Sequence, residues 1–133
     1  MKVYVAGKFT DKENIQAKMK NIEKLGCVIT FDWTRFEDED LTRAAEKAII
    51  GVKTCDIVIV IMDDKDYSYR GTFTEVGIAI GTNKIIFLYN PNKDASCDTN
   101  VFYHAKEITH FKQWHMLLNE VEKVANEKIV NLI

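Results

Sequence analysis

The chain has 133 residues, of which 47% are hydrophobic and 29% charged, and a formal net charge of −2. Domains are typically about 100–150 residues long, so we expect residues 1–133 to form a single domain with its own core. Acidic and basic residues are mixed along the chain, which argues against nucleic acid as a partner. The longest apolar run is far shorter than the ~20 residues of a membrane helix, and the N-terminal apolar stretch is too short for a signal peptide. We therefore expect no membrane partner and a cytoplasmic location.

The predicted elements alternate between strands and helices. In chain order they are a strand over 2–7, a helix over 11–25, a strand over 27–31, a loop over 32–40, a helix over 41–53, a strand over 56–62, a loop, a helix over 72–82, a strand over 84–89, a loop over 92–99, a short edge strand over 107–111 and a last helix from 114. This alternation predicts right-handed βαβ units. We expect an α/β fold, a flavodoxin- or Rossmann-like three-layer sandwich around a mostly parallel five-stranded sheet of order 2-1-3-4-5. The loops after the first and third strands then face each other at the switch point, where open α/β sheets bind ligands.

The most informative segment is 69–77, which follows the most apolar run of the chain, 56–62. We expect Glu75 to lie in the first turn of a helix at the switch point. An acid at that position either stabilises the helix dipole, by about 0.3–1 kcal/mol, or acts as a nucleophile. Two neighbours favour a ligand site, because Gly71 allows close backbone approach and Thr72 offers a hydroxyl and a free amide.

Several common cofactor motifs are absent from the sequence. It contains neither GxGxxG nor GxxxxGK[ST], which argues against a dinucleotide-dependent dehydrogenase and a P-loop NTPase. Its three cysteines are widely spaced without a CxxC pair, and its three histidines have no metal-ligand spacing. We expect no metal and no organic cofactor.

Three segments resemble the nucleoside 2-deoxyribosyltransferase family, which includes 2′-deoxynucleoside 5′-monophosphate N-glycosidases. They are Gly7-Lys8-Phe9-Thr10-Asp11, Gly51-Val52-Lys53-Thr54-Cys55-Asp56-Ile57 and Gly71-Thr72-Phe73-Thr74-Glu75-Val76-Gly77, and the resemblance runs from residue 2 to about residue 118. It implies that Glu75 attacks the anomeric carbon of deoxyribose and expels the base. The deoxyribosyl group then passes to water or to another base.

The resemblance also implies binding residues and an oligomer. Phe9 would lie beside the bound nucleoside, while Asn100 and Phe102 would complete the active site of a neighbouring subunit. The protein would then be a homo-oligomer, a dimer or larger.

Two positions depart from the family pattern. Ala48 stands where a second carboxylate is usual, and Glu46 points to nearly the opposite helix face. Tyr69 stands where the transferases carry an aspartate, which favours hydrolysis over base exchange. We expect Tyr69 to take part in catalysis by a hydrogen bond to a sugar hydroxyl or to Glu75.

A leaving base needs a proton, and the acidic loop after the third strand offers three donors. They are Asp63, Asp64 and Asp66, which we expect to border the crevice. The alternative interpretation is a solvated acidic loop.

The predicted substrate-binding residues gather around the same crevice. They are Gly7, Lys8, Phe9, Thr10, Trp33, Asp63, Gly71, Thr72, Asn100 and Phe102. Lys8, Arg35 and Arg70 are candidate contacts of a 5′-phosphate, with solvated surface charges as the alternative. Trp33 and Phe36 are candidates to stack a base, with burial against the sheet edge as the alternative.

Three functions remain open from the sequence. The first is cleavage of the N-glycosidic bond of a 2′-deoxynucleoside or its 5′-monophosphate, with a small-molecule nucleoside or nucleotide as partner. The second is a non-catalytic nucleotide-binding module, which Ala48 favours. The third is an NAD or cyclic-nucleotide glycohydrolase, which rests on fold analogy.

Overall fold

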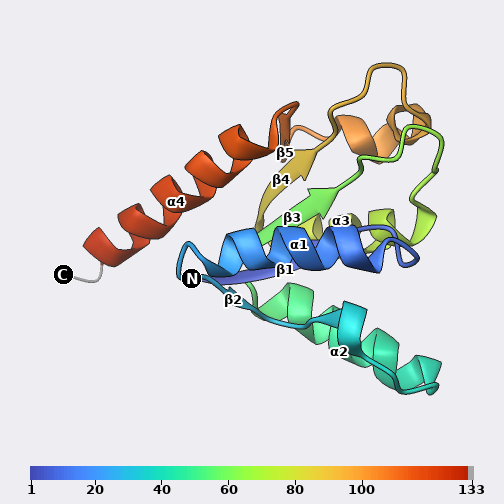
Figure 1. Cartoon of the computed structure of the whole chain (residues 1–133), viewed down its shortest axis with the longest axis horizontal. Coiled ribbons are helices and arrows are strands. Elements are labelled where there is room, and N and C mark those ends of the chain that lie inside the picture. Colours follow the sequence, from blue (N-terminus) through green and yellow to red (C-terminus); the bar gives the residue numbers. More distant parts are fainter. Residues whose placement is uncertain (132–133) are drawn as a thin grey trace.

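Five parallel strands form the central sheet of the protein, in a computed structural model that describes residues 1–131 (Figure 1). The strands are β1 (Lys2–Ala6), β2 (Val28–Ile29), β3 (Ile57–Ile61), β4 (Ile85–Tyr89) and β5 (Ile108–Phe111). Their order is β2-β1-β3-β4-β5, and every neighbouring pair is parallel. The predicted α/β fold and strand order are confirmed, and the switch point lies between β1 and β3.

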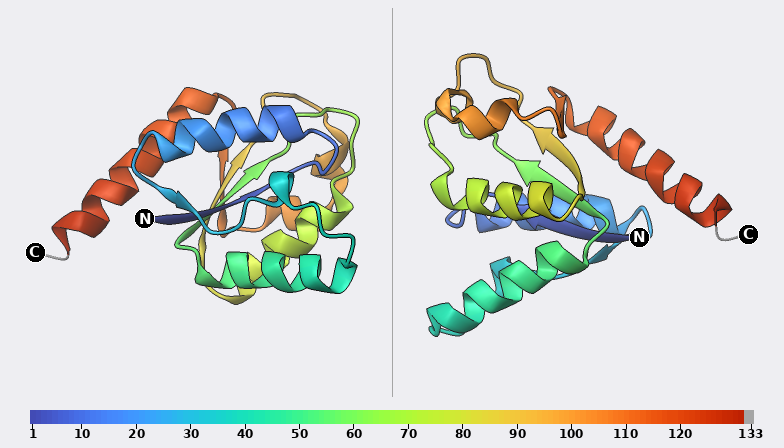
Figure 2. Two further views of the ribbon diagram at one scale, coloured as in Figure 1. Left: turned by 60° about the horizontal axis from the view of Figure 1, so that its bottom comes forward. Right: turned by 180° about the vertical axis from the view of Figure 1, so that it is seen from behind.

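Helices cover both faces of this sheet (Figures 1 and 2). They are α1 (Lys12–Glu23), α2 (Leu41–Thr54), α3 (Arg70–Gly81) and α4 (Trp114–Val130). Because successive strand residues point to opposite faces, Ile59 packs with Ile15 of α1 and Leu117 of α4, while Val58 packs with Val76 of α3 on the other side. The result is the predicted three-layer sandwich. No helix within residues 1–131 is both long and apolar enough to cross a membrane.

The largest differences from the predicted elements lie at β2 and in the loops. β2 spans two residues instead of the predicted 27–31, and the hydroxyl of the following Thr30 donates to the Gly51 carbonyl at 2.8 Å. The predicted loop over 32–40 contains the short 3₁₀ helix η1 (Trp33–Arg35), capped by Asp32. Two more 3₁₀ helices, η2 (Ser96–Thr99) and η3 (Val101–His104), follow β4.

Helix α3 begins at Arg70, two residues earlier than predicted. Tyr69 takes a left-handed conformation with φ of 58°, and its carbonyl accepts the amide of Phe73 at 3.1 Å. The expectation that Glu75 lies in the first turn is therefore wrong, since that turn contains no acid. Helix-dipole effects fall off within the first turn, so the dipole interpretation of Glu75 loses its basis.

Candidate active site

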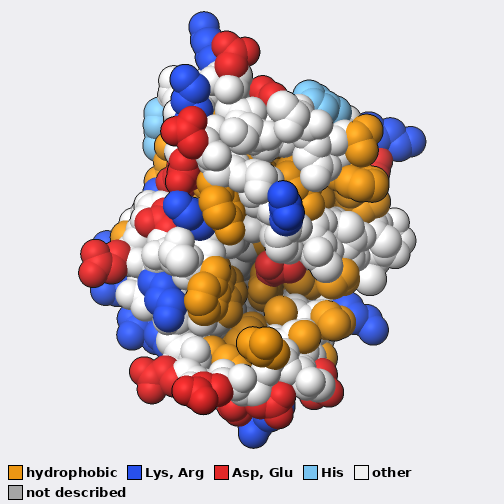
Figure 3. Space-filling model, turned by 90° about the vertical axis from the view of Figure 1, so that its right-hand side faces the viewer, with side chains coloured by type: hydrophobic (Ala, Val, Ile, Leu, Met, Phe, Trp, Pro, Cys, Tyr) orange, Lys and Arg blue, Asp and Glu red, His pale blue; other side chains and the backbone are white. Residues whose placement is uncertain are grey.

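A cavity of about 300 Å³ opens beside the switch point, a size at the lower end of small-molecule sites. Six aromatic residues line it: Tyr4, Phe9, Phe31, Trp33, Phe36 and Tyr67. Two acidic residues, Asp38 and Glu75, also line it, while Lys, Arg and His are absent from its wall. Figure 3 shows this side of the molecule, where hydrophobic side chains gather around a hollow.

Two contacts join the segment that follows β1 to the loop and the helix α3 that follow β3. The Thr72 hydroxyl donates to the Gly7 carbonyl at 3.1 Å, and the Lys8 ammonium donates to the Asp64 carboxylate at 2.7 Å. These contacts bear out the expected meeting of the two loops. A Cβ at Gly7 would lie 2.6 Å from Cδ1 of Ile15, so glycine at this position lets α1 pack against the end of β1.

Glu75 lines the cavity from the second turn of α3. The residue is partly buried, and its Oε2 atom is shielded from solvent without a hydrogen-bond partner among the described residues. Desolvation raises the pKa of this carboxyl group to about 7, although a hydrogen bond from Tyr4 acts to lower it. A buried, unpartnered carboxylate oxygen at a cavity wall is available to a ligand.

Tyr4 is the phenol that accompanies Glu75. Its side chain is fully buried on the face of the sheet that α2 and α3 cover. Burial and the nearby Glu75 charge raise the pKa of Tyr4 well above its ordinary value. A Cβ at Gly51 would lie 2.9 Å from Cδ2 of Tyr4, so glycine in α2 makes room for the ring. The sequence signal for Tyr4 was a phenol in an apolar central strand, which needs a polar partner when buried.

The structure gives Tyr69 a different position from the one expected. It is buried, its hydroxyl accepts the Asp64 amide at 2.9 Å, and it does not line the cavity. Its backbone is left-handed, and its ring meets that of Tyr67 edge-on with centroids 4.7 Å apart. The phenol beside Glu75 thus belongs to Tyr4, and the expected contact of Tyr69 with Glu75 is corrected.

The three aspartates after β3 are also outside the cavity wall. Asp63 accepts a hydrogen bond from Asn14 at 2.9 Å, and Asp64 is paired with Lys8. This ion pair raises the pKa of Lys8 and lowers that of Asp64. Asp66 is exposed. Their arrangement favours the alternative of a solvated, ion-paired loop over that of a proton donor.

The candidate phosphate contacts do not line the cavity. Lys8 is held by Asp64, and Arg35 is largely exposed with its Nε 3.3 Å from Asp32. Arg70 is exposed at the start of α3, next to the cavity residue Gly71. Thr10 is exposed and likewise absent from the wall.

Aromatic side chains from two segments form one wall. Phe9, which is 65% exposed, stacks on Trp33 with ring centroids 6.2 Å apart. The Trp33 indole donates to the Val5 carbonyl at 2.7 Å, which fixes its ring at the end of β1. Phe36 meets Phe31 edge-on at 5.4 Å. The structure thus brings Phe9, Trp33 and Phe36 to the same cavity as Glu75.

Two further predicted positions lie outside the cavity of their own chain. The Asn100 side chain accepts the amide of Phe102 at 2.9 Å, and the Phe102 ring is 58% exposed. Ala48 does line the cavity, whereas Glu46 is exposed and absent from its wall.

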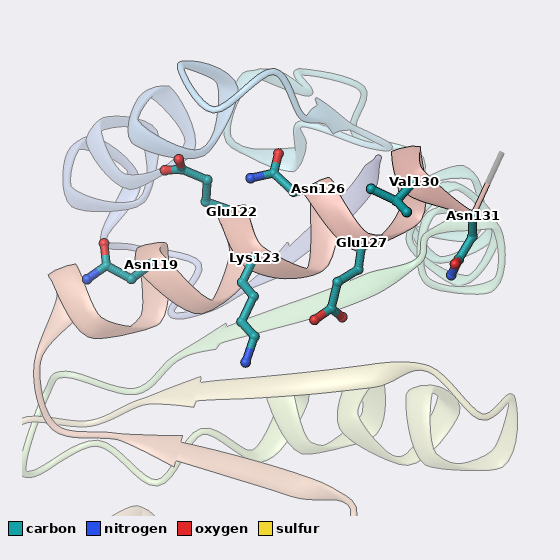
Figure 4. A pocket seen from close by; sticks show the side chains of 7 residues that line it. All are labelled: Asn119, Glu122, Lys123, Asn126, Glu127, Val130 and Asn131. Carbon is teal, nitrogen blue, oxygen red and sulfur yellow. The ribbon is translucent and has the colours of Figure 1, made fainter. Parts of the chain in front are cut away.

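A larger hollow, of about 710 Å³, runs along the outer side of α4 (Figure 4). Its residues lie in α4 between Asn119 and Val130 and at Asn131, which directly follows the helix, so no second helix or strand supplies converging groups. Within residues 1–131, no group of three His, Cys, Asp or Glu side chains is placed to hold a metal ion. The cavity around Glu75 remains the best candidate for chemistry.

The profile of one protein family, Nucleoside 2-deoxyribosyltransferase, matches the chain over residues 3–131. The chain belongs to this family. The match confirms the resemblance seen in three sequence segments and makes the protein a member of an enzyme family. A search of curated proteins found no match.

Two solved structures share the fold of this nucleoside 2-deoxyribosyltransferase family member. One is the CMP N-glycosidase BcmB of Clostridium botulinum, with a TM-score of 0.61 and 17% identity over 92% of this chain and 99% of that one. The other is a 2-desoxiribosyltransferase from Leishmania mexicana, with a TM-score of 0.65 and 15% identity over 92% of this chain and 97% of that one.

We predict that Glu75→Gln stabilises the protein at alkaline pH. The folded pKa of about 7 lies above the ordinary 4.5, so between these values the folded state binds more protons and stability falls as pH rises. At about 1.4 kcal/mol per pH unit, the neutral amide should raise the unfolding free energy at pH 8 by at most about 3 kcal/mol. Urea denaturation at pH 4.5 and 8 tests this, with the exposed Glu37→Gln as control. An equal effect of Glu75→Gln at both pH values would contradict it.

Proposed function

We propose that the protein cleaves the N-glycosidic bond of a 2′-deoxynucleoside or its 5′-monophosphate, with Glu75 as nucleophile. The observation that carries the proposal is the unpartnered, desolvated Oε2 of Glu75 at the wall of an aromatic cavity. A carboxylate in that environment stabilises a positively charged, oxocarbenium-like carbon and then bonds to it. Membership of the family supports this chemistry.

The reaction would proceed in two displacements. The Glu75 carboxylate forms a bond to C1′ while the bond from C1′ to the base nitrogen breaks, and its electron pair leaves with the base, which takes up a proton. Water then bonds to C1′ and loses a proton, and the bond from C1′ to Glu75 breaks. The products are the free base and the deoxyribose or its 5′-phosphate. If a second base replaces water, the deoxyribosyl group is transferred to that base. Tyr69 disfavours this transfer, because it stands where the resemblance places the aspartate of the transferases.

The aromatic wall supports a flat, uncharged part of the substrate. Trp33 and Phe9 present large rings on one side of the cavity, and Phe31 and Phe36 present theirs nearby. Stacking of a base on an aromatic ring contributes about 1–3 kcal/mol. The base therefore fits the aromatic wall when the sugar meets Glu75.

We predict that the wild type releases free base from deoxynucleosides or their monophosphates. In Glu75→Ala the rate of base release should fall by at least about 1,000-fold. The assay incubates the protein with deoxynucleosides, their 5′-monophosphates, ribonucleotides and NAD, and follows free base by chromatography. The exposed Glu46→Ala serves as control. Adding a second free base distinguishes transfer from hydrolysis.

Other results of the same assay favour the alternatives. Binding without base release would indicate a nucleotide-binding module. Release from NAD alone would indicate a glycohydrolase of a different substrate class. Full activity of Glu75→Ala would remove the proposed nucleophile.

We predict that kcat/KM rises with pH through about 7, because only the ionised carboxylate is nucleophilic. The hydrogen bond from Tyr4 lowers the pKa of Glu75. Tyr4→Phe should therefore move the midpoint of the pH profile upward, while Tyr89→Phe, on the far side of the sheet, leaves it unchanged. A midpoint near 4.5 in the wild type would contradict the role of Glu75 burial.

We further propose that the active unit is a homo-oligomer, a dimer or larger, in which Asn100 and Phe102 of one chain complete the cavity of another. Large apolar side chains of α2 and η3 are exposed on the described chain, which supports an interface there. They are Leu41, Ile49, Ile50, Val101 and Phe102.

Mixing two inactive variants tests the shared site. In a hybrid dimer of Glu75→Ala and Asn100→Ala chains, one site carries both changes and the other carries neither. Random reassembly should restore about a quarter of the wild-type activity. Light scattering measures the mass of each species. No recovery from hybrids, or an active wild-type monomer, would contradict the shared site.

A further inference from the structure

Most polar side chains around the cavity are already engaged with the protein. The Thr72 hydroxyl donates to the Gly7 carbonyl, and the Trp33 indole donates to the Val5 carbonyl. Tyr4 and Glu75 interact with each other at the proposed reaction centre. The groups left to recognise the rest of a ligand are the Asp38 carboxylate and the Tyr67 hydroxyl.

Asp38 is held in an orientation that leaves it able to accept more hydrogen bonds. Its Oδ2 lies 3.3 Å from Arg43 Nη1, and its Oδ1 accepts the Asp40 amide at 2.9 Å. The ion pair is the arrangement of an ionised carboxylate, which accepts at about four lone-pair positions and donates none. The side chain is 32% exposed, so it borders the cavity with acceptor capacity to spare.

The position of Asp38 relates it to the base and not to the sugar. Glu75 enters the cavity from α3, whereas Asp38 enters from the segment between η1 and α2, two residues after Phe36. Phe31 and Phe36 stand in the same wall segment as Asp38. When a base stacks on these rings and its sugar lies at Glu75, one edge of the base faces Asp38. The Asp38 carboxylate can only accept hydrogen bonds, so that edge must supply a donor.

We propose that Asp38 selects nucleosides whose base carries an exocyclic amino group, by accepting a hydrogen bond from that group. This inference rests on the proposed function of the same cavity. Cytosine and adenine present an amino group where uracil and hypoxanthine present a carbonyl oxygen, and an oxygen facing a carboxylate leaves both acceptors without a proton. Losing a hydrogen bond to a charged group costs enough to discriminate about 10- to 100-fold between the members of each pair.

The test compares deoxycytidine with deoxyuridine, and deoxyadenosine with deoxyinosine. Each pair exchanges the amino group for a carbonyl oxygen, and the adjacent ring nitrogen changes with it from an acceptor to an N–H donor. The wild type should show a kcat/KM about 10- to 100-fold higher for the amino member. The amide in Asp38→Asn offers both an acceptor and a donor. The kcat/KM for the amino substrate should therefore fall and that for the carbonyl substrate rise, so that their ratio becomes about 1. Glu37→Gln and Glu39→Gln remove a neighbouring exposed charge outside the cavity wall and should keep the wild-type ratio.

A binding measurement separates this inference from the proposed function. Calorimetric titration of Glu75→Gln with the same four nucleosides, with and without Asp38→Asn, needs no turnover. If the amino members bind more tightly in a manner that depends on Asp38, and the wild type does not cleave them, the inference is supported and the proposed function is contradicted. Cleavage that depends on Glu75 with the same ratio in wild type and Asp38→Asn overturns the inference alone. Neither binding nor cleavage overturns both.

Discussion

Burial of the Glu75 carboxyl group is the constraint around which the rest of the site is arranged. Removing a carboxylate oxygen from water without a partner costs free energy, and here it raises the pKa of the group to about 7. Tyr4 recovers part of that cost by hydrogen bonding, and Gly51 gives the Tyr4 ring its space. In the proposed reaction, the same desolvation strengthens the interaction of the carboxylate with a developing positive charge, so instability and the proposed reactivity arise from one cause.

The surroundings of the cavity divide their polar groups between structure and recognition. Four polar side chains form hydrogen bonds within the protein, and these bonds hold the segments after β1 and β3 in place. The four are Thr72, Trp33, Lys8 and Tyr69. These contacts leave a wall of aromatic rings with few free acceptors and no positive charge. A rigid wall of this kind positions a flat ligand, while the free acceptors decide which ligand fits.

The two solved relatives keep the fold at 17% and 15% sequence identity. Such divergence is compatible with one fold because the sheet core needs apolar side chains of suitable volume and not particular ones. Positions in the cavity wall are subject to a different constraint. Ala48, where the sequence resemblance leads us to expect a carboxylate, lines the cavity. Tyr69 has a left-handed backbone and lies outside the wall. The chemistry of this chain therefore has to be inferred from its own cavity.

Local patterns in the sequence determined the sheet order, the switch point and the place of Glu75 beside it, because hydrophobic periodicity and βαβ handedness act over short stretches of chain. They also indicated Trp33 and Gly71, and the family resemblance indicated Phe9. All three residues line the cavity. Tertiary structure alone decided that Tyr4 meets Glu75, that Asp38 reaches the cavity and that Lys8 is tied to Asp64. Each of these contacts depends on how distant segments pack or on the path of an irregular loop, and neither leaves a periodic signal in the sequence.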